Sequence, residues 1–180
     1  GLARALLLLR APLLAARRAA AAAAAAVALG ASAAVAPRAA AAPIATSPAA
    51  AAPRERIREA GLEHRITLLQ EDYRNLQGRY DKLVSIEMIE AVGHQYYPDY
   101  FRTLGRLLKD DGLGLIQAIT IDDKRYEKAK NNIDWIQRYI FPGACLPSLK
   151  ALLEHSSRYS DLELRHLEDI TPHYARTLKL

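Results

Sequence analysis

The chain has 180 residues, 51% of them hydrophobic, a length that suits a single domain. Its net charge of +5 comes entirely from arginines in the first 53 residues, so we expect no basic face and no nucleic-acid partner. The lone Cys145 excludes an internal disulfide and a thiolate zinc site, so we expect no bound metal and a reducing compartment.

Residues 1–53 form a low-complexity segment rich in Ala, Arg and Pro, without any Asp or Glu. The alanine run favours a helix over residues 13–29, and Pro43, Pro48 and Pro53 then interrupt regular structure. Three origins stay open for the segment: an organellar transit peptide, a degenerate signal segment, or a wrong reading frame in GC-rich DNA. In each case we expect a flexible tail or an isolated helix that packs poorly on the rest.

Residues 54–180 have the composition of a globular domain in which strands and helices alternate. In chain order we expect a helix end at 54–60 closed by Gly61, a strand at 66–69 and a strand at 82–86. An amphipathic helix at 98–109, a turn at 110–112 and a strand at 113–119 should follow. The last elements expected are a helix at 124–136 capped by Asp122 or Asp123, a helix from Ser148, and strands at 162–167 and 174–180. This order is typical of a parallel sheet covered by helices.

Three motifs stand out in this second part. Residues 84–93 read VSIEMIEAVG with YPDYF at 97–101, residues 136–143 read IQRYIFPG with LPS at 146–148, and residues 172–178 read PHYARTL. Together they resemble the cyclopropane-fatty-acid synthase family, which includes the mycolic acid cyclopropane synthases. The resemblance extends over residues 54–180.

The resemblance implies an α/β fold of the class I methyltransferase (Rossmann-like) type, with a mostly parallel sheet that here lacks the family's first two strands. It implies methyl transfer from S-adenosylmethionine to the cis double bond of an unsaturated phospholipid at a membrane surface, with closure to a cyclopropane. The expected location is cytoplasmic and peripheral to the membrane, or an organelle if residues 1–53 are a transit peptide, and a homodimer is one expected assembly. Two rivals stay open: a methyltransferase that makes methyl-branched lipid or methylates a small amine, and a non-enzymatic remnant.

The base in this family is a bound bicarbonate ion, and the resemblance carries its site onto four positions. Glu90 matches the glutamate that accepts a hydrogen bond from the ion, Ile119 the backbone contact, and Tyr174 the hydroxyl donor. Gln117 stands where some members have a histidine, and an amide donates a hydrogen bond there without carrying charge. Taken singly, each has an ordinary alternative as a capping, strand-end or packing residue. Glu90 and Ile119 lie at the carboxyl ends of successive strands, where open α/β sheets bind ligands.

Three further residues are candidates by resemblance. Asp72 and Tyr73 occupy the point where related methyltransferases contact the adenine of the cofactor, with a turn-capping Asp as the alternative. Tyr139 is the candidate that stabilises the transient carbocation with its ring, with ordinary packing as its alternative. The family's glycine-rich cofactor loop has no counterpart in the chain, so we expect weak binding of S-adenosylmethionine.

Overall fold

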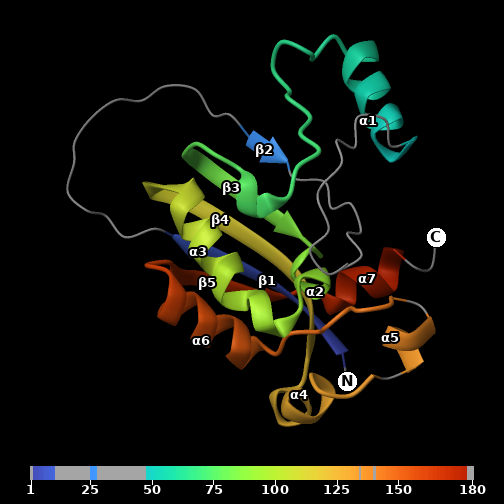
Figure 1. Ribbon diagram of the computed structural model, residues 1–180, viewed down its shortest axis with the longest axis vertical. Coiled ribbons are helices and arrows are strands. Elements are labelled where there is room, and N and C mark those ends of the chain that lie inside the picture. The colour runs from blue at the N-terminus through green and yellow to red at the C-terminus, as the bar shows by residue number, and fades with distance from the viewer. Residues whose placement is uncertain (1, 11–24, 28–47, 134, 140, 178–180) are drawn as a thin grey trace. The chain divides into compact units, whose positions relative to one another are not determined.

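The computed structural model describes residues 2–10, 25–27, 48–133, 135–139 and 141–177 (Figure 1). They belong to two compact units, one of residues 1–35 with 77–180 and one of residues 36–76. The helices and strands are β1 (Leu2–Arg10), β2 (Ala25–Val27), α1 (Pro48–Glu59), β3 (Tyr80–Ile86), α2 (Ile89–Val92), α3 (Tyr97–Leu107), β4 (Leu108–Ile121), α4 (Asp123–Ala129), α5 (Trp135–Tyr139), α6 (Leu149–Tyr159), β5 (Glu163–Asp169) and α7 (Thr171–Thr177), with short 3-10 turns at Tyr73–Asn75 and His94–Tyr96.

The strands form one sheet in the order β2-β3-β4-β1-β5. Strands β2, β3 and β4 run parallel to one another, as the alternation of strands and helices predicts. Strand β1 is antiparallel to both of its neighbours, β4 and β5. The predicted α/β class is confirmed, and the sheet is mixed because β1 enters it between β4 and β5.

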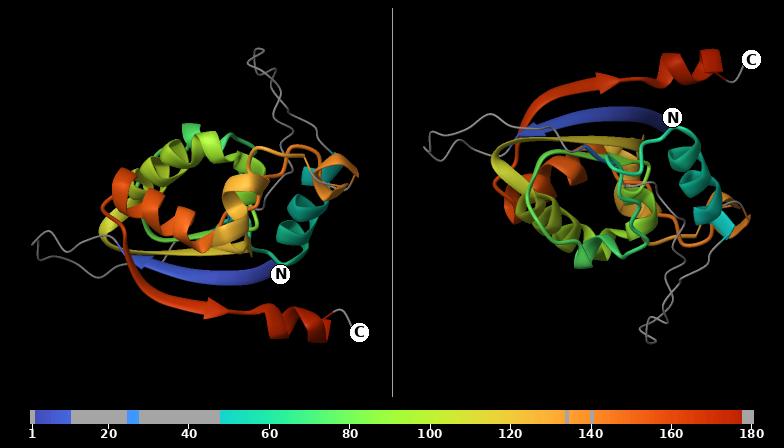
Figure 2. Two further views of the ribbon diagram at one scale, coloured as in Figure 1. Left: turned by 90° about the horizontal axis from the view of Figure 1, so that it is seen from below. Right: turned by 90° about the horizontal axis from the view of Figure 1, so that it is seen from above.

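Helices α3 and α6 lie side by side over one face of this sheet (Figure 2). Strand β4 alternates accordingly, so that Ile116 and Ala118 are buried while the residues between them are half-buried. From α3, the side chains of Tyr97, Tyr100 and Phe101 are completely buried. The predicted amphipathic helix is therefore confirmed, and its apolar side makes the core against the sheet.

Strand β1 corrects the expectation that residues 1–53 pack poorly. Leu7 and Leu9 are each 1% exposed, and the strand is hydrogen-bonded on both edges, to β4 and to β5. The averaged composition of the segment concealed a leucine-rich stretch at its start, which buries far more apolar area than alanine does. Most of the helix expected over 13–29 lies outside the described residues, and Ala25–Val27 within it is strand β2.

Two predicted strands are absent from the described residues. Residues 66–69 form no strand, and Ile66 and Leu69 are 43% and 55% exposed. Without a neighbouring strand their backbone groups would lose water and gain no partner, so the segment stays irregular. The chain at 174–177 belongs to helix α7. Asp169, at the end of β5, accepts a hydrogen bond from the N–H of Thr171 (2.9 Å), the first residue of that helix. Residues 178–180 lie outside the described range.

Several local predictions are confirmed. Gly61 has φ +65° and ends α1, with the Leu62 N–H donating to the Ile57 carbonyl (3.0 Å). Asp122 caps α4 and Ser148 caps α6. Helix α1 also runs through the expected domain boundary at residue 53. The predicted turn at 110–112 is wrong, because these residues belong to β4. The pairing of β3 with β4 is only irregular there, with Tyr80 opposite Leu108 and Lys82 opposite Leu113.

The burial of β1 yields a test on two neighbouring leucines. Leu7→Ala should lower the free energy of unfolding by about 2–5 kcal/mol, because it opens a cavity in the core. Leu8→Ala, on the opposite and only half-buried face of the same strand, should cost clearly less. Urea unfolding followed by circular dichroism measures both. Equal losses for the two variants would contradict the placement of β1.

Candidate functional site

The turn that follows β3 is bonded directly to β4. Glu87, the first residue after the strand, has φ +47° and is the one non-glycine residue with positive φ in the part of the chain that the structure describes. Such a backbone conformation costs of order 1–3 kcal/mol and persists where neighbouring contacts enforce it. Here the Glu87 N–H donates to the Gln117 carbonyl (2.8 Å). The turn therefore carries α2 onto the carboxyl edge of the parallel strands.

Glu90 in α2 meets Ile119 in β4 at this edge. The Glu90 side chain is only 7% exposed, and its Oε1 accepts a hydrogen bond from the Ile119 N–H (2.5 Å). A hydrogen bond from a backbone N–H stabilises a carboxylate that burial would otherwise disfavour. Two residues predicted to share a site are thus in direct contact.

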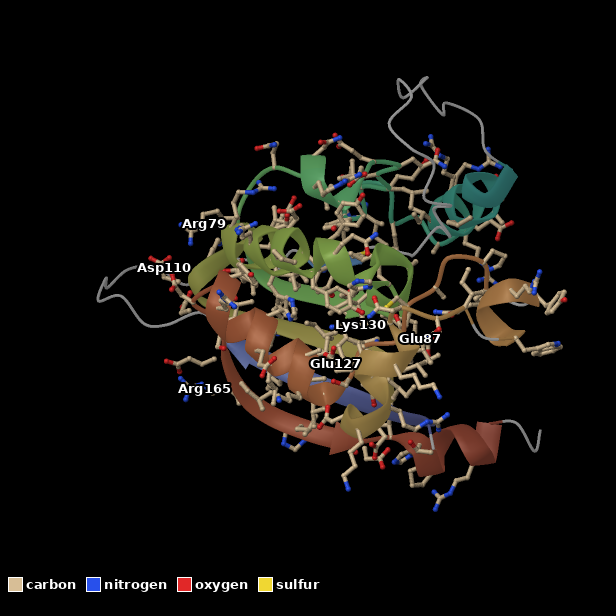
Figure 3. All side chains as sticks on the ribbon, turned by 60° about the horizontal axis from the view of Figure 1, so that its bottom comes forward. Arg79, Glu87, Asp110, Glu127, Lys130 and Arg165 are labelled. Carbon is tan, nitrogen blue, oxygen red and sulfur yellow. The ribbon has the colours of Figure 1, made fainter. Side chains whose placement is uncertain are left out.

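Gln117 lies two positions earlier on β4 and contacts a residue that the sequence analysis missed. Its Nε2 donates to Oε1 of Glu87 (3.3 Å; Figure 3 labels Glu87). Glu87 therefore orients the amide that stands in the histidine position of the family. The sequence did offer one signal for Glu87, since it is a second carboxylate of the motif, directly after the strand and three positions before Glu90. No sequence pattern indicated the positive φ angle of Glu87.

The loop before α6 closes over Glu90 from the other side. The Cys145 N–H donates to the Glu90 carbonyl (2.7 Å), and the Tyr97 hydroxyl donates to the Cys145 carbonyl (3.1 Å). The Ile121 N–H donates to the Pro147 carbonyl (2.9 Å), so the loop is also tied to β4. These backbone bonds fix α2, β4 and the loop relative to one another.

Cys145 is buried in this loop, with its Sγ 3.8 Å from His94 Nδ1. Burial raises the pKa of the Cys145 thiol, against a smaller lowering effect of a hydrogen bond from the His94 backbone. Burial also raises the pKa of Tyr97, which keeps its hydroxyl protonated and able to donate. A protonated, enclosed thiol is a poor nucleophile, which favours the interpretation of Cys145 as a packing residue.

The remaining candidates lie elsewhere. Tyr139 is on α5, 63% exposed, with its ring centroid 5.8 Å from that of Trp135. Tyr174 belongs to α7, and its side chain is outside the description. The roles of both stay predictions.

Asp72 and Tyr73 belong to the unit of residues 36–76 and are described within it. Asp72 caps the 3-10 turn at Tyr73–Asn75, accepting hydrogen bonds from the N–H and the Nε of Arg74 (both 2.9 Å). These bonds lower the pKa of Asp72. The carboxylate thus has the contacts of the turn-capping alternative, and the predicted contact with the cofactor stays a prediction.

The donor and acceptor set around Glu90 suits a bicarbonate ion. Bicarbonate has one O–H donor and several acceptor oxygens, which complement a carboxylate acceptor and a backbone N–H donor. Because Glu90 and Ile119 bond to each other, an ion would have to separate that pair and replace one hydrogen bond by two. The fit of these residues to the ion thus rests on their donor and acceptor types.

Comparison with known proteins places these residues among lipid-modifying relatives. The sequence profile of the family described as "Mycolic acid cyclopropane synthetase" matches residues 44–180. A tuberculostearic acid methyltransferase of Mycobacterium tuberculosis is 42% identical over 127 residues, which are 71% of this chain and 30% of that protein. A cyclopropane-fatty-acyl-phospholipid synthase of Escherichia coli is 39% identical over 102 residues, or 56% of this chain and 25% of that protein. The chain therefore spans less than a third of either relative.

Two solved structures of cyclopropane synthases have a fold similar to that of this chain. A mycolic acid cyclopropane synthase complexed with SAH and CTAB aligns with a TM-score of 0.53 and 29% identity, covering 62% of this chain and 42% of that chain. A second cyclopropane synthase, from Mycobacterium tuberculosis, aligns with a TM-score of 0.54 and 24% identity, over 69% of this chain and 48% of that chain. At that identity the second match supports the fold alone.

The enclosed thiol gives a pH-dependent test. Because burial raises the pKa of Cys145, the reactive thiolate should be scarce at pH 8 and increase only as the pH rises further. We expect Ellman's reagent to modify the native chain at least about tenfold more slowly than the chain in urea. Cys145 is the single cysteine, so the signal has one source. Equal native and unfolded rates would show that the loop does not enclose the thiol.

Proposed function

Because the chain belongs to the mycolic acid cyclopropane synthetase family, we propose that it is the carboxy-terminal part of a catalytic domain that methylates lipid with S-adenosylmethionine. The proposed acceptor is the cis double bond of an unsaturated phospholipid acyl chain, and the proposed product is a cyclopropane ring. The observation that carries the proposal is the buried contact between Glu90 and the Ile119 N–H (2.5 Å) at the carboxyl edge of two parallel strands.

The residues at this edge have separate tasks in the proposed reaction. A bicarbonate ion bound here would supply general-base chemistry for the loss of a proton from the methylated acyl chain. Glu90, as acceptor, and the Ile119 N–H, as donor, are the groups that would hold it. Gln117, oriented by Glu87, supplies a neutral donor beside them, and Tyr174 is proposed as a further donor. Burial of Glu90 excludes water, which strengthens each of these hydrogen bonds.

Among the described residues, the candidates for contact with the methyl donor are Asp72 and Tyr73. Asp72 is bound by Arg74 through both its N–H and its side chain, so its carboxylate is not open to a ribose or an adenine without breaking those bonds. Tyr73 alone offers one aromatic contact. We therefore propose no step that depends on cofactor contacts made by this chain.

A second candidate is formation of a methyl-branched lipid. It is favoured by the 42% identity to a tuberculostearic acid methyltransferase, which exceeds the 39% identity to the cyclopropane-fatty-acyl-phospholipid synthase. Both reactions begin with methyl transfer to an alkene carbon. Proton loss with closure of the ring gives the cyclopropane, whereas proton loss without closure gives an unsaturated methyl-branched chain. Mass spectrometry of the lipid product separates a ring from a branch. Methylation of a small amine and a non-enzymatic remnant are the remaining alternatives.

The first test concerns the methyl donor. The chain of 180 residues should bind S-adenosylmethionine weakly or not at all, because its sequence has no counterpart of the family's glycine-rich loop and Asp72 is already bonded to Arg74. Isothermal titration calorimetry of the purified chain measures this. Saturable one-to-one binding in the micromolar range would mean that the chain holds a cofactor site of its own.

The second test concerns Glu90 and uses a chain completed with the cofactor-binding part of a close relative. Glu90→Gln should lower the rate of lipid methylation by about ten- to a hundredfold, because one charge-assisted hydrogen bond to the ion contributes about 1.5–3 kcal/mol. Binding of S-adenosylmethionine should change much less, since Glu90 is proposed to hold the base. Tyr174→Phe should act in the same direction but more mildly, and added bicarbonate should partly restore either variant.

Glu154→Gln is the matched control, because Glu154 is an exposed glutamate on α6 that pairs with Lys150 at the surface. It should retain full turnover. Normal turnover of Glu90→Gln, or an equal loss of turnover and of cofactor binding, would make Glu90 a structural residue only.

A further inference from the structure

Glu87 is an exception among the residues of the described chain that have positive φ. The other residues are all glycines, namely Gly61, Gly78, Gly93 and Gly143. Glycine adopts this conformation without a clash of a Cβ atom. A glycine at position 87 would keep the bond from its N–H to the Gln117 carbonyl and would remove the strain. The backbone of the turn therefore gives no reason for a glutamate, and strain retained at the edge of a candidate site indicates that the side chain has a task.

The Glu87 side chain determines which way the amide of Gln117 faces. Gln117 Nε2 donates to Glu87 Oε1 (3.3 Å), while the Glu87 N–H donates to the Gln117 carbonyl (2.8 Å), so the two residues are bonded through both backbone and side chain. An ionised carboxylate has only acceptor oxygens. It attracts Nε2 of the amide and repels Oε1, so the amide is held with its nitrogen toward Glu87.

The two donors proposed for the ion lie two positions apart on β4, and each contacts a glutamate of the same segment. Glu87 is bonded to the side-chain amide of Gln117, and Glu90 to the backbone N–H of Ile119. The two carboxylates differ in their surroundings, because Glu87 is exposed whereas Glu90 is buried. Solvent screens the charge of Glu87, so its repulsion of a neighbouring anion is weak, while its hydrogen bond to Gln117 acts at short range. Glu87 can therefore orient a donor without excluding the ion.

We propose that Glu87 is a positioning residue of the candidate site, kept at a strained position because its carboxylate holds Gln117 as a hydrogen-bond donor to the ion. This role rests on the proposed function, in which bicarbonate binds at this edge. A protonated histidine donates from both ring nitrogens, whereas an amide donates from one end only. If the Gln117 amide turned over, its Oε1 would face the anion and weaken its binding. The need for Glu87 thus follows from the presence of glutamine at position 117.

The strain distinguishes a positioning role of Glu87 from a purely structural one, in the full chain and without any ligand. Glu87→Gly should unfold at the same temperature or up to about 4 °C higher, because the relief of strain offsets the loss of one side-chain hydrogen bond. Thermal unfolding followed by circular dichroism measures this, with Glu154→Gln as the control at an exposed surface pair. A clear fall in the unfolding temperature of Glu87→Gly alone would make Glu87 a structural tie between the turn and β4, and would overturn the proposal.

Binding of bicarbonate to the full chain measures the positioning role directly. In a chain labelled with ¹⁵N, added bicarbonate should shift the NMR signals of the Ile119 N–H and of the Gln117 side chain, with chloride at equal ionic strength as the reference. The Gln117 side-chain signals are identified by their absence from Gln117→Leu. Glu87→Gln preserves the size of the side chain but offers both a donor and an acceptor, so the Gln117 amide can turn over. It should raise the half-saturating bicarbonate concentration about two- to tenfold, because only about a half to a tenth of the amides would then face the ion with Nε2.

A double-mutant cycle shows whether Glu87 acts through Gln117. Gln117→Leu should raise the half-saturating concentration at least as much as Glu87→Gln does, and adding Glu87→Gln to it should have little further effect. Glu154→Gln should leave the concentration unchanged. A full effect of Glu87→Gln in the Gln117→Leu chain, or normal binding by Glu87→Gln alone, would overturn the proposal.

Failure of this role and failure of the proposed function give different results. If Glu87→Gln binds bicarbonate normally while Glu90→Gln binds it poorly, the ion site stands and the role of Glu87 fails. If Glu87→Gln binds it poorly and Glu90→Gln binds it normally, the proposed role of Glu90 fails and that of Glu87 stands. If bicarbonate shifts neither the Ile119 nor the Gln117 signal in the unaltered chain, both roles are overturned.

Discussion

Strand β1 pairs with β4 on one edge and with β5 on the other, and among the described strands it is the one that joins β5 to the sheet. Backbone N–H and C=O groups removed from water need partners, and all the strand pairing described for β5 is with β1. Helix α7 follows β5 directly and carries Tyr174. The position of a candidate site residue near the end of the chain therefore depends on nine residues at its beginning.

The candidate site depends in turn on a few hydrogen bonds between backbone segments far apart in sequence. Glu87 and Glu90 are bonded to β4, and the Glu90 carbonyl also accepts from Cys145. The backbone around Glu90 is held in this way, while its carboxylate would have to leave the Ile119 N–H to admit an ion.

Much of this arrangement could be predicted from the sequence, because the relevant signals are local. The run at 82–86, the apolar spacing from Tyr97 and the caps at Asp122 and Ser148 each depend on neighbouring residues, and all were confirmed. The closeness of Glu90 and Ile119 followed from the rule that parallel strands end at one edge.

The predictions that were wrong concern segments whose structure depends on partners distant in the chain. The run at 66–69 has strand-like residues but no strand beside it, and the leucines of β1 were discounted because of the alanines that follow them. The strained backbone at Glu87 has no signature in residue type. The strand propensity of a segment shows that it can form a strand, while the presence of a pairing partner in the sheet determines whether it does.

The two outer strands of the sheet bear on how copies of the chain meet. Strand β5 reads ELRHLED, is exposed along its whole length, and carries a pairing of Arg165 with Glu163 and of His166 with Glu168 (3.8 Å). The strand at the other edge, β2, has three described residues. A charged edge and a very short one both discourage a foreign strand from extending the sheet. Aggregation by edge-to-edge growth is thereby opposed, and two copies of the chain that associate would have to meet through side-chain surfaces.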